Sequence, residues 1–177
     1  MESVKNHVIN EDENIYLYAL QFSRMYDRVV ESQNRVPAST ENAEVINAHK
    51  MKGTIVAELV NLAFADELYL KAILKHEKAN YRHEHRLDKL YNLLSKEAQK
   101  DIKDTTVNMY KNISGQDVDF DDFLVKNANI FVDWRYAFEK SASASVDLFV
   151  VFSTILKVYA TDIFYPEVTK NVIEGNY

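Results

Sequence analysis

The chain has no cysteine, and only three of its 177 residues are glycine and two are proline. The absence of cysteine excludes disulfide bonds, thiolate nucleophiles and zinc sites with cysteine ligands. The scarcity of glycine and proline excludes a β-rich fold, because a sandwich or barrel needs a turn signal about every 8 to 12 residues. The chain is therefore expected to consist mostly of long helices.

An excess of basic charge and long apolar runs are also missing. The sequence has 21 basic and 27 acidic side chains and a net charge of −6, which argues against non-specific nucleic-acid binding by the whole surface. The most apolar window, Val146–Val158, is too short to span a bilayer. The first residues contain no apolar stretch typical of a secretory signal. We therefore expect a cytoplasmic protein that makes no membrane contact.

Hydrophobic periodicity predicts a single all-α domain over residues 1–177, with its core at about 11–165. The fold class is an up-and-down bundle of four to five long helices with short connecting helices. The expected helices cover about 11–33, 40–51, 55–74, 87–94, 95–113, 119–138 and 145–164. Predicted boundaries lie at Pro37, Gly53, Gly115 and Pro166, and predicted N-caps at Thr40, Ser95, Asp119 and Ser145.

Basic residues gather in the middle of the chain, where residues 70–115 carry 10 basic and 6 acidic side chains. Lys71, Lys75, Lys78 and Arg82 recur at helical spacing, which predicts one basic stripe along the central helix. Such a row can bind the phosphates of RNA or a nucleotide. The alternative is a solvated helix face, where basic residues near the C-terminus interact favourably with the helix dipole.

Two clusters of possible ligands do not predict a metal site. His76, His83 and His85 lie close together in the sequence, but the Glu-x-x-His pairs of a di-metal bundle do not occur. Residues 117–122 alternate like a calcium loop but lack its glycine, so Asp119 is interpreted as a helix cap. We expect no metal and no other cofactor.

One charged residue on the central helix and one on a later helix are predicted to meet. Glu67 lies within the apolar central helix, and Arg135 lies beside Trp134 on an aromatic helix face. Because buried charges need partners, we expect Glu67 or Asp66 to form an ion pair with Arg135. The alternative is that Arg135 faces a cleft and binds a phosphate.

Three stretches together resemble the HEPN (higher eukaryote and prokaryote nucleotide-binding) family of helical domains. They are AFADELYLKAIL (63–74), HRLDKLYNLL (85–94) and FVDWRYAFE (131–139). The resemblance implies an up-and-down helical bundle that usually dimerises and often occurs in toxin–antitoxin or other prokaryotic defence proteins. Active members are metal-independent ribonucleases that carry Arg, four to six residues, then His.

The chain departs from the ribonuclease motif of that family. Arg135 matches the arginine, but Lys140 and its neighbours stand where the histidine would be, and no histidine follows His85. Lys140 can bind phosphate, yet a lysine is a poor general base unless it is strongly desolvated. Because the chain lacks this motif, a non-catalytic member of the family is favoured.

The leading hypothesis is thus a HEPN-like binding or assembly module. It is expected to be a homodimer through the aromatic faces near Trp134, in a defence or toxin–antitoxin setting, and to bind RNA, a nucleotide or a protein partner. One alternative is a ribonuclease in which His83 or His85 approaches Arg135 in the fold or across a dimer. The other is a helical scaffold with no ligand.

Overall fold

The computed structural model describes residues 9–34, 43–129 and 146–174, and within these ranges the chain is helical without strands. This confirms the all-α prediction. The helices are α1 (Glu11–Asn34), α2 (Ala43–His76), α3 (Leu87–Leu93), α4 (Lys96–Ser114), α5 (Phe120–Lys126), α7 (Val146–Phe164) and α8 (Pro166–Glu174).

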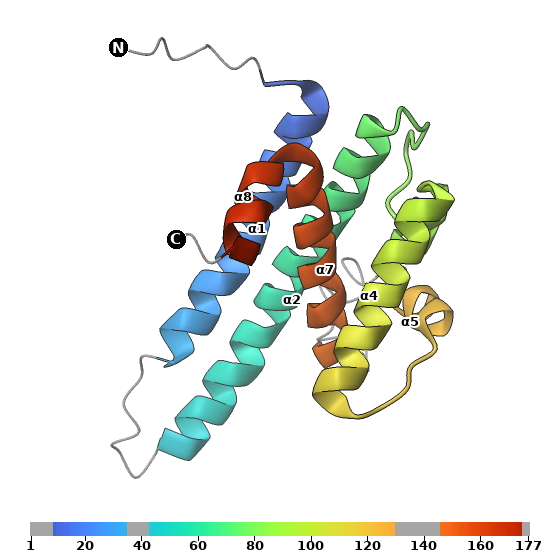
Figure 1. Cartoon of the computed structure of the whole chain (residues 1–177). Helices are drawn as coiled ribbons and strands as arrows, with labels where there is room; N and C mark the ends of the chain where they lie inside the picture. The colour runs from blue at the N-terminus through green and yellow to red at the C-terminus, as the bar shows by residue number, and fades with distance from the viewer. Residues whose placement is uncertain (1–8, 35–42, 130–145, 175–177) are drawn as a thin grey trace, which may run out of the picture.

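The four long helices α1, α2, α4 and α7 lie alongside one another, and each of α1, α2 and α4 runs opposite to the next (Figure 1). Glu11 at the start of α1 pairs with Lys75 at the end of α2, at 2.8 Å. The backbone N–H of Ser95, before α4, donates to Glu77 Oε2, just after α2, at 3.0 Å. Helix α7 packs against α1, α2 and α4. Helix α8 folds back beside α7, and α5 lies next to α4, where Asp121 of α5 pairs with Lys103 of α4 at 2.8 Å (Figure 1).

The core forms around the second half of α2, which is apolar on nearly every side. A helix of this composition is stable only when other helices cover it. Helices α1 and α7 both pack against it, and α7 supplies many buried apolar side chains, including the fully buried rings of Phe149 and Phe152. The apolar α2 side chains with no exposed surface are Ala63, Ala65, Tyr69, Leu70, Ala72, Ile73 and Leu74.

Several predicted helix ends are confirmed by their capping contacts. Ser95 Oγ accepts a hydrogen bond from the backbone N–H of Ala98 at 3.2 Å. The Asp119 carboxylate accepts from the backbone N–H groups of Asp121 and Asp122, at 3.1 and 3.0 Å. Gly115 ends α4 with φ of 70°, the left-handed conformation that glycine adopts without steric cost. The residue types at these positions therefore predicted the helix ends correctly.

Two predicted boundaries are wrong. Helix α2 continues through Gly53, because a glycine inside a helix costs only about 1 kcal/mol, which tertiary packing can outweigh. Helix α5 ends at Lys126 instead of continuing to about 138. There the Asn127 side chain donates to the Phe123 carbonyl at 2.8 Å, and the Ala128 carbonyl accepts from the Leu87 N–H at 3.0 Å. Pro37, Thr40, Trp134 and Ser145 lie outside the described residues.

The last core helix ends as predicted, but a further helix follows it. Helix α7 ends at Phe164, and Pro166 is the first residue of α8. Proline is favoured at this position because its ring fixes a helical φ and the missing N–H would have no partner within the helix. Pro166 therefore separates two helices.

The C-terminus of α2 forms a Schellman turn. The N–H of Ala79 donates to the Leu74 carbonyl at 2.9 Å, and the N–H of Lys78 donates to the Lys75 carbonyl at 3.0 Å. This pair of bonds requires that the residue just after the helix has the left-handed backbone conformation, with positive φ. Lys78 takes that place with φ of 59° although it has a side chain.

We predict that Lys78→Gly raises the free energy of unfolding by about 1 kcal/mol, because a Cβ at positive φ costs roughly 1–2 kcal/mol. Urea denaturation measures the effect. Lys78→Ala is the matched control, since it removes the same charge but keeps the Cβ. Equal stability of the two variants would contradict the assignment of the gain to backbone strain.

Asp66 is a fully buried acid between α2 and α7. Ser153 Oγ lies 2.6 Å from Asp66 Oδ2 and 2.9 Å from the Phe149 carbonyl, while Oδ1 has no partner within the described part of the chain. Burial raises the pKa of the Asp66 carboxyl well above its ordinary value, more than the bond to Ser153 lowers it. A serine hydroxyl has one hydrogen, so both contacts are satisfied when protonated Asp66 donates to Ser153 and Ser153 donates to Phe149.

We predict that Asp66→Asn becomes progressively more stable relative to the parent as the pH rises above about 4. The unfolded chain loses the Asp66 proton there while the folded chain keeps it, so the parent loses stability as the pH rises toward the folded pKa. The difference grows by at most about 1.4 kcal/mol per pH unit. Urea unfolding of both proteins from pH 4 to 8 measures it, and a constant difference would show that Asp66 is ionised in the fold.

Candidate functional site

The predicted basic stripe does not form one continuous row on a helix. Lys71 and Lys75 lie on α2, but that helix ends at His76. Lys78 occupies the left-handed turn, and Arg82 lies in the connection 77–86 that leads to α3. The prediction of four cations on one helix face is wrong, because the Schellman turn redirects the chain after His76.

The two helical lysines are already engaged by acids. Lys71 Nζ lies 2.7 Å from Glu67 Oε1, and Lys75 Nζ lies 2.8 Å from Glu11 Oε2. Lys78 and Arg82 are exposed, and their side chains make no ion pair or hydrogen bond within the described ranges. Of these four cations, the two without an acidic partner among the described residues therefore lie in the connection and not on α2.

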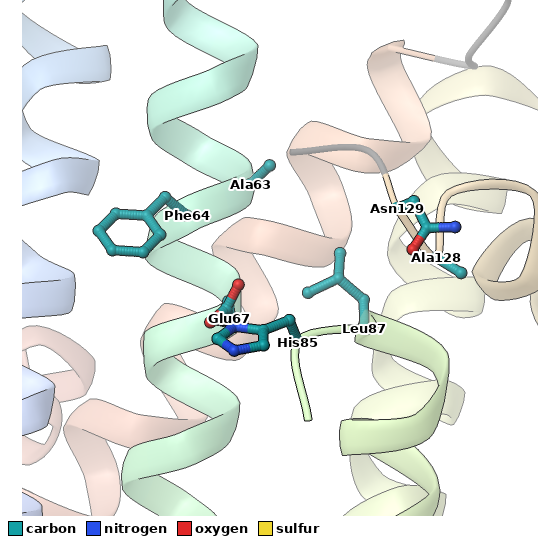
Figure 2. Close-up of a pocket in the computed structure, with 7 residues that line it drawn as sticks. All are labelled: Ala63, Phe64, Glu67, His85, Leu87, Ala128 and Asn129. Carbon is teal, nitrogen blue, oxygen red and sulfur yellow. Dashed lines mark hydrogen bonds and ion pairs between the residues drawn. The ribbon is translucent and has the colours of Figure 1, made fainter. Parts of the chain in front are cut away.

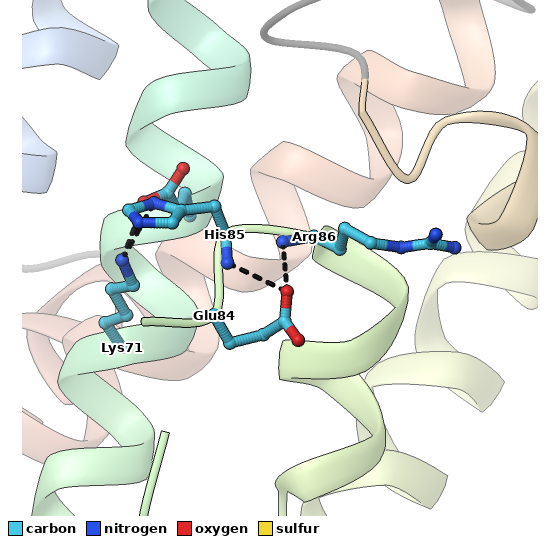
Figure 3. A network of polar contacts seen from close by, with 5 residues as sticks. Lys71, Glu84, His85 and Arg86 are labelled. Carbon is cyan, nitrogen blue, oxygen red and sulfur yellow. Dashed lines mark hydrogen bonds and ion pairs between the residues drawn. The ribbon is translucent and has the colours of Figure 1, made fainter. Parts of the chain in front are cut away.

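Glu67, Lys71 and His85 meet beside this connection. Glu67 is 4% exposed, and its Oε1 accepts from Lys71 and lies 2.9 Å from Nδ1 of His85. Nδ1 also lies 3.4 Å from Lys71 Nζ, which can only donate a hydrogen bond (Figure 3). The contact with the Glu67 carboxylate, which can only accept, is the shorter one and favours the tautomer in which Nδ1 carries the proton. The neutral ring then has its lone pair at Nε2, on a side chain that is 70% exposed. Glu67 thus holds the ring of His85 in place and favours this tautomer.

The backbone around His85 is held by a second acid. Glu84 Oε1 accepts from the backbone N–H groups of His85 and Arg86, both at 2.9 Å (Figure 3). The Arg86 N–H contributes most to lowering the pKa of the Glu84 carboxyl, with further contributions from the His85 N–H and from Lys89. The Arg86 guanidinium in turn pairs with Asp88 at 2.9 Å and lowers the pKa of that carboxyl. His85 is therefore supported from both its side chain and its backbone.

A pocket of about 260 Å³ opens beside the Glu67–His85 contact. Figure 2 shows Glu67 and His85 together on one side, with Leu87, Ala128 and Asn129 opposite them. The bond from the Leu87 N–H to the Ala128 carbonyl joins the start of α3 to the end of α5 and so closes that side. The remaining wall is α2, and the lining residues are Ala63, Phe64, Glu67, His85, Leu87, Ala128 and Asn129. The pocket is mostly apolar with one carboxylate and one imidazole.

The other predicted site residues do not join this group. His83 is exposed in the connection with φ of 62°. Arg135 and Lys140 lie outside the described residues, so the predicted Glu67–Arg135 ion pair stays a prediction. Asp66, the other predicted partner of Arg135, faces Ser153. Across the described ranges, three or more histidine or acidic side chains nowhere gather as metal ligands would.

Glu67, Lys71 and His85 were each singled out from the sequence as candidate residues. Their contact with one another was not predicted. Glu67 and Lys71 are four residues apart on a helix, a spacing from which an ion pair can be expected. His85 lies 18 residues from Glu67, and only the turn after α2 brings it back. The end of α5 was missed altogether, because that region was predicted to be the interior of a longer helix.

Comparison with family models, with curated proteins and with solved structures finds no match to this chain. None of the described helices has both the length and the apolar character needed to cross a membrane. The site must therefore be interpreted from its own geometry.

We predict that Glu67 and Lys71 are coupled by about 1 kcal/mol in a double-mutant cycle, because both side chains are largely removed from water. Their exposed fractions are 6% and 15%. The variants are Glu67→Gln, Lys71→Met and the double variant, compared by urea unfolding. Asp122 and Lys126 form a matched pair at the same spacing but with 50% and 70% exposure. A coupling no larger than that of the control pair would contradict the structural importance of Glu67.

Proposed function

We propose that the chain is a HEPN-like, non-catalytic binding module, and that it binds RNA or a nucleotide at the pocket beside Glu67 and His85. The proposal is supported by the resemblance of three sequence stretches to that family and by the chemistry of the pocket. The observation that carries it is the placement of a buried carboxylate and an exposed imidazole at one apolar pocket.

The pocket has the groups that a nucleobase requires. Apolar side chains, among them Leu87 and Ala128, can contact the flat faces of a ring, and the Glu67 carboxylate can accept a hydrogen bond from its amino group. His85 adds an exposed aromatic ring at the same place, and RNA-binding proteins commonly stack unpaired bases on such rings. With about 260 Å³, the pocket is near the lower end of ligand sites, roughly 300–1,000 Å³, which suits a single base.

The connection 77–86 supplies charge for the phosphates. Lys78 and Arg82 are exposed and unpaired among the described residues, and both lie on the segment that ends at His85. They raise the local positive potential on a chain whose total charge is negative. A ligand that places a base in the pocket can therefore direct its phosphates toward this connection.

Dimerisation and a defence or toxin–antitoxin setting belong to the same proposal and rest on the family resemblance alone. The aromatic residues near Trp134 that are expected to form the dimer lie outside the described residues. Sedimentation of the purified chain tests this part separately from ligand binding.

One observation favours a second function, that of a metal-independent ribonuclease. His85 is oriented by Glu67 through Nδ1, and a carboxylate-oriented histidine is a suitable general base or acid. In that case Arg135 would stabilise the charge that develops on the phosphate. The absence of the Arg-x4–6-His motif makes this the weaker proposal.

We predict that Glu67→Gln and His85→Asn each weaken binding of fluorescently labelled single-stranded RNA about tenfold, the loss of roughly one hydrogen bond to a charged group. Fluorescence anisotropy at several salt concentrations measures the affinity, with unlabelled mononucleotides as competitors. His83→Asn is the matched control, because it removes a nearby exposed histidine that does not line the pocket. Equal affinities of all three variants would exclude this pocket as the site.

The same samples separate binding from cleavage. The binding proposal expects the RNA to remain intact after prolonged incubation. RNA cleavage that is lost in both His85→Asn and Arg135→Ala would instead establish the ribonuclease function.

A further inference from the structure

Two arginines on α1 have no partner among the described residues. Arg24 and Arg28 are exposed, and neither makes an ion pair or a side-chain hydrogen bond within the part of the chain that the structure describes. They are four residues apart on one helix face, where like charges repel by about 0.2–0.5 kcal/mol. Asp27, the nearest acid in the sequence, is 3.1 Å from Lys157 of α7. Within the described ranges, two adjacent positive charges of α1 are therefore left without an acidic partner.

Both arginines line a second pocket, of about 480 Å³. Phe22 and Met25 of α1 provide its apolar surface, and Gln21 and Asn61 add amide groups. Met25 is 47% exposed, so its side chain is accessible to the apolar part of a ligand. The pocket combines a double positive charge with an apolar surface, and its volume falls within the roughly 300–1,000 Å³ typical of small-molecule sites.

This pocket is separate from the one beside His85. Phe22, which lines the α1 pocket, and Phe64, which lines the Glu67 pocket, contact each other edge to face with their centroids 4.6 Å apart. The aromatic pair thus lies between the two pockets. A ligand at Arg24 and Arg28 does not need the Glu67–His85 contact.

We propose that Arg24 and Arg28 bind a small organic phosphate, with the phosphate held by both guanidiniums and the apolar part of the ligand against Phe22 and Met25. Guanidinium groups match phosphate oxygens in a bidentate geometry that an ammonium group cannot provide. Two guanidiniums balance a phosphate dianion, whereas a carboxylate compensates only one of them. A flexible methionine adapts to ligands of different shape. This proposal is independent of the function proposed for the Glu67 pocket.

A small ligand is favoured over a nucleic acid or a membrane. Binding to nucleic acid normally uses many phosphate contacts, and here two cations stand on a chain with a net charge of −6. A lipid surface would likewise need a larger basic cluster. A small phosphate ester with an apolar substituent is the ligand that two arginines and an adjoining apolar surface can satisfy.

Isothermal titration of the full chain with phenyl phosphate tests the proposal. We expect saturable binding that Arg24→Gln and Arg28→Gln each weaken about tenfold or more, a loss of about 1.4 kcal/mol. Benzoate and inorganic phosphate are expected to bind more weakly, because each lacks one of the two recognised parts. Lys100→Gln, which removes an exposed cation of α4 that lines neither pocket, is the matched control and should bind as the parent does. A loss of affinity in Arg82→Gln would instead assign the ligand to the connection 77–86.

Three results would overturn the proposal. The first is no detectable binding of phenyl phosphate, and the second is an equal loss of affinity in Arg82→Gln. The third is preference for a polyanion or a membrane. It would appear as tighter, Arg24-dependent binding to single-stranded RNA or to vesicles of phosphatidylcholine and phosphatidic acid in equal parts.

Discussion

Burial of the second half of α2 is the constraint on which the rest of this structure depends. The helix is covered from Leu59 to Leu74 by α1 and α7 together with the connection to α3. A polar side chain on such a helix must find its partner inside the protein, because water does not reach it. Two neighbouring acids meet this requirement in different ways. Asp66 faces α7 beside Ser153, where burial raises the pKa of its carboxyl, whereas Glu67 stays close to two nitrogen donors.

The Glu67 contacts link the packing of the bundle to its candidate site. Lys71 satisfies Glu67 from the next turn of the same helix, and His85 approaches from a segment that has left the helix. The left-handed turn at Lys78 makes this return possible, and Glu84 fixes the backbone on either side of His85. The residue that stabilises the connection is therefore also the residue that lines the pocket. Its removal would affect folding as well as the proposed ligand binding, so variants of unchanged shape are needed to separate the two.

Local chemistry made much of the fold predictable. Ser95, Asp119 and Gly115 occupy the helix ends that their side chains or backbone favour, and each of these interactions involves residues at most four apart. Where a boundary depended on tertiary packing, the prediction was wrong. Gly53 lies inside α2, and α5 stops early because Asn127 caps it and Ala128 bonds to Leu87.

The candidate site was only half predictable for the same reason. The spacing of Glu67 and Lys71 indicates a pair on one helix, but the contact of Glu67 with His85 depends on how the connection folds back. The arginines of α1 carry no recognisable motif, and their significance appears only when the partners of Asp27 and the surroundings of Phe22 are known. Residues 130–145, which contain Arg135, lie outside the described ranges, so the sequence prediction for that arginine stands as it was made.

The central claim is that the buried carboxylate of Glu67 orients His85 at the pocket. Long-range proton–nitrogen NMR correlation of the imidazole ring tests it most directly, at a pH where the ring is neutral. We expect Nδ1 of His85 to carry the proton and Glu67→Gln to lower this preference. A ring protonated at Nε2 in the parent protein, unchanged in the variant, would contradict it.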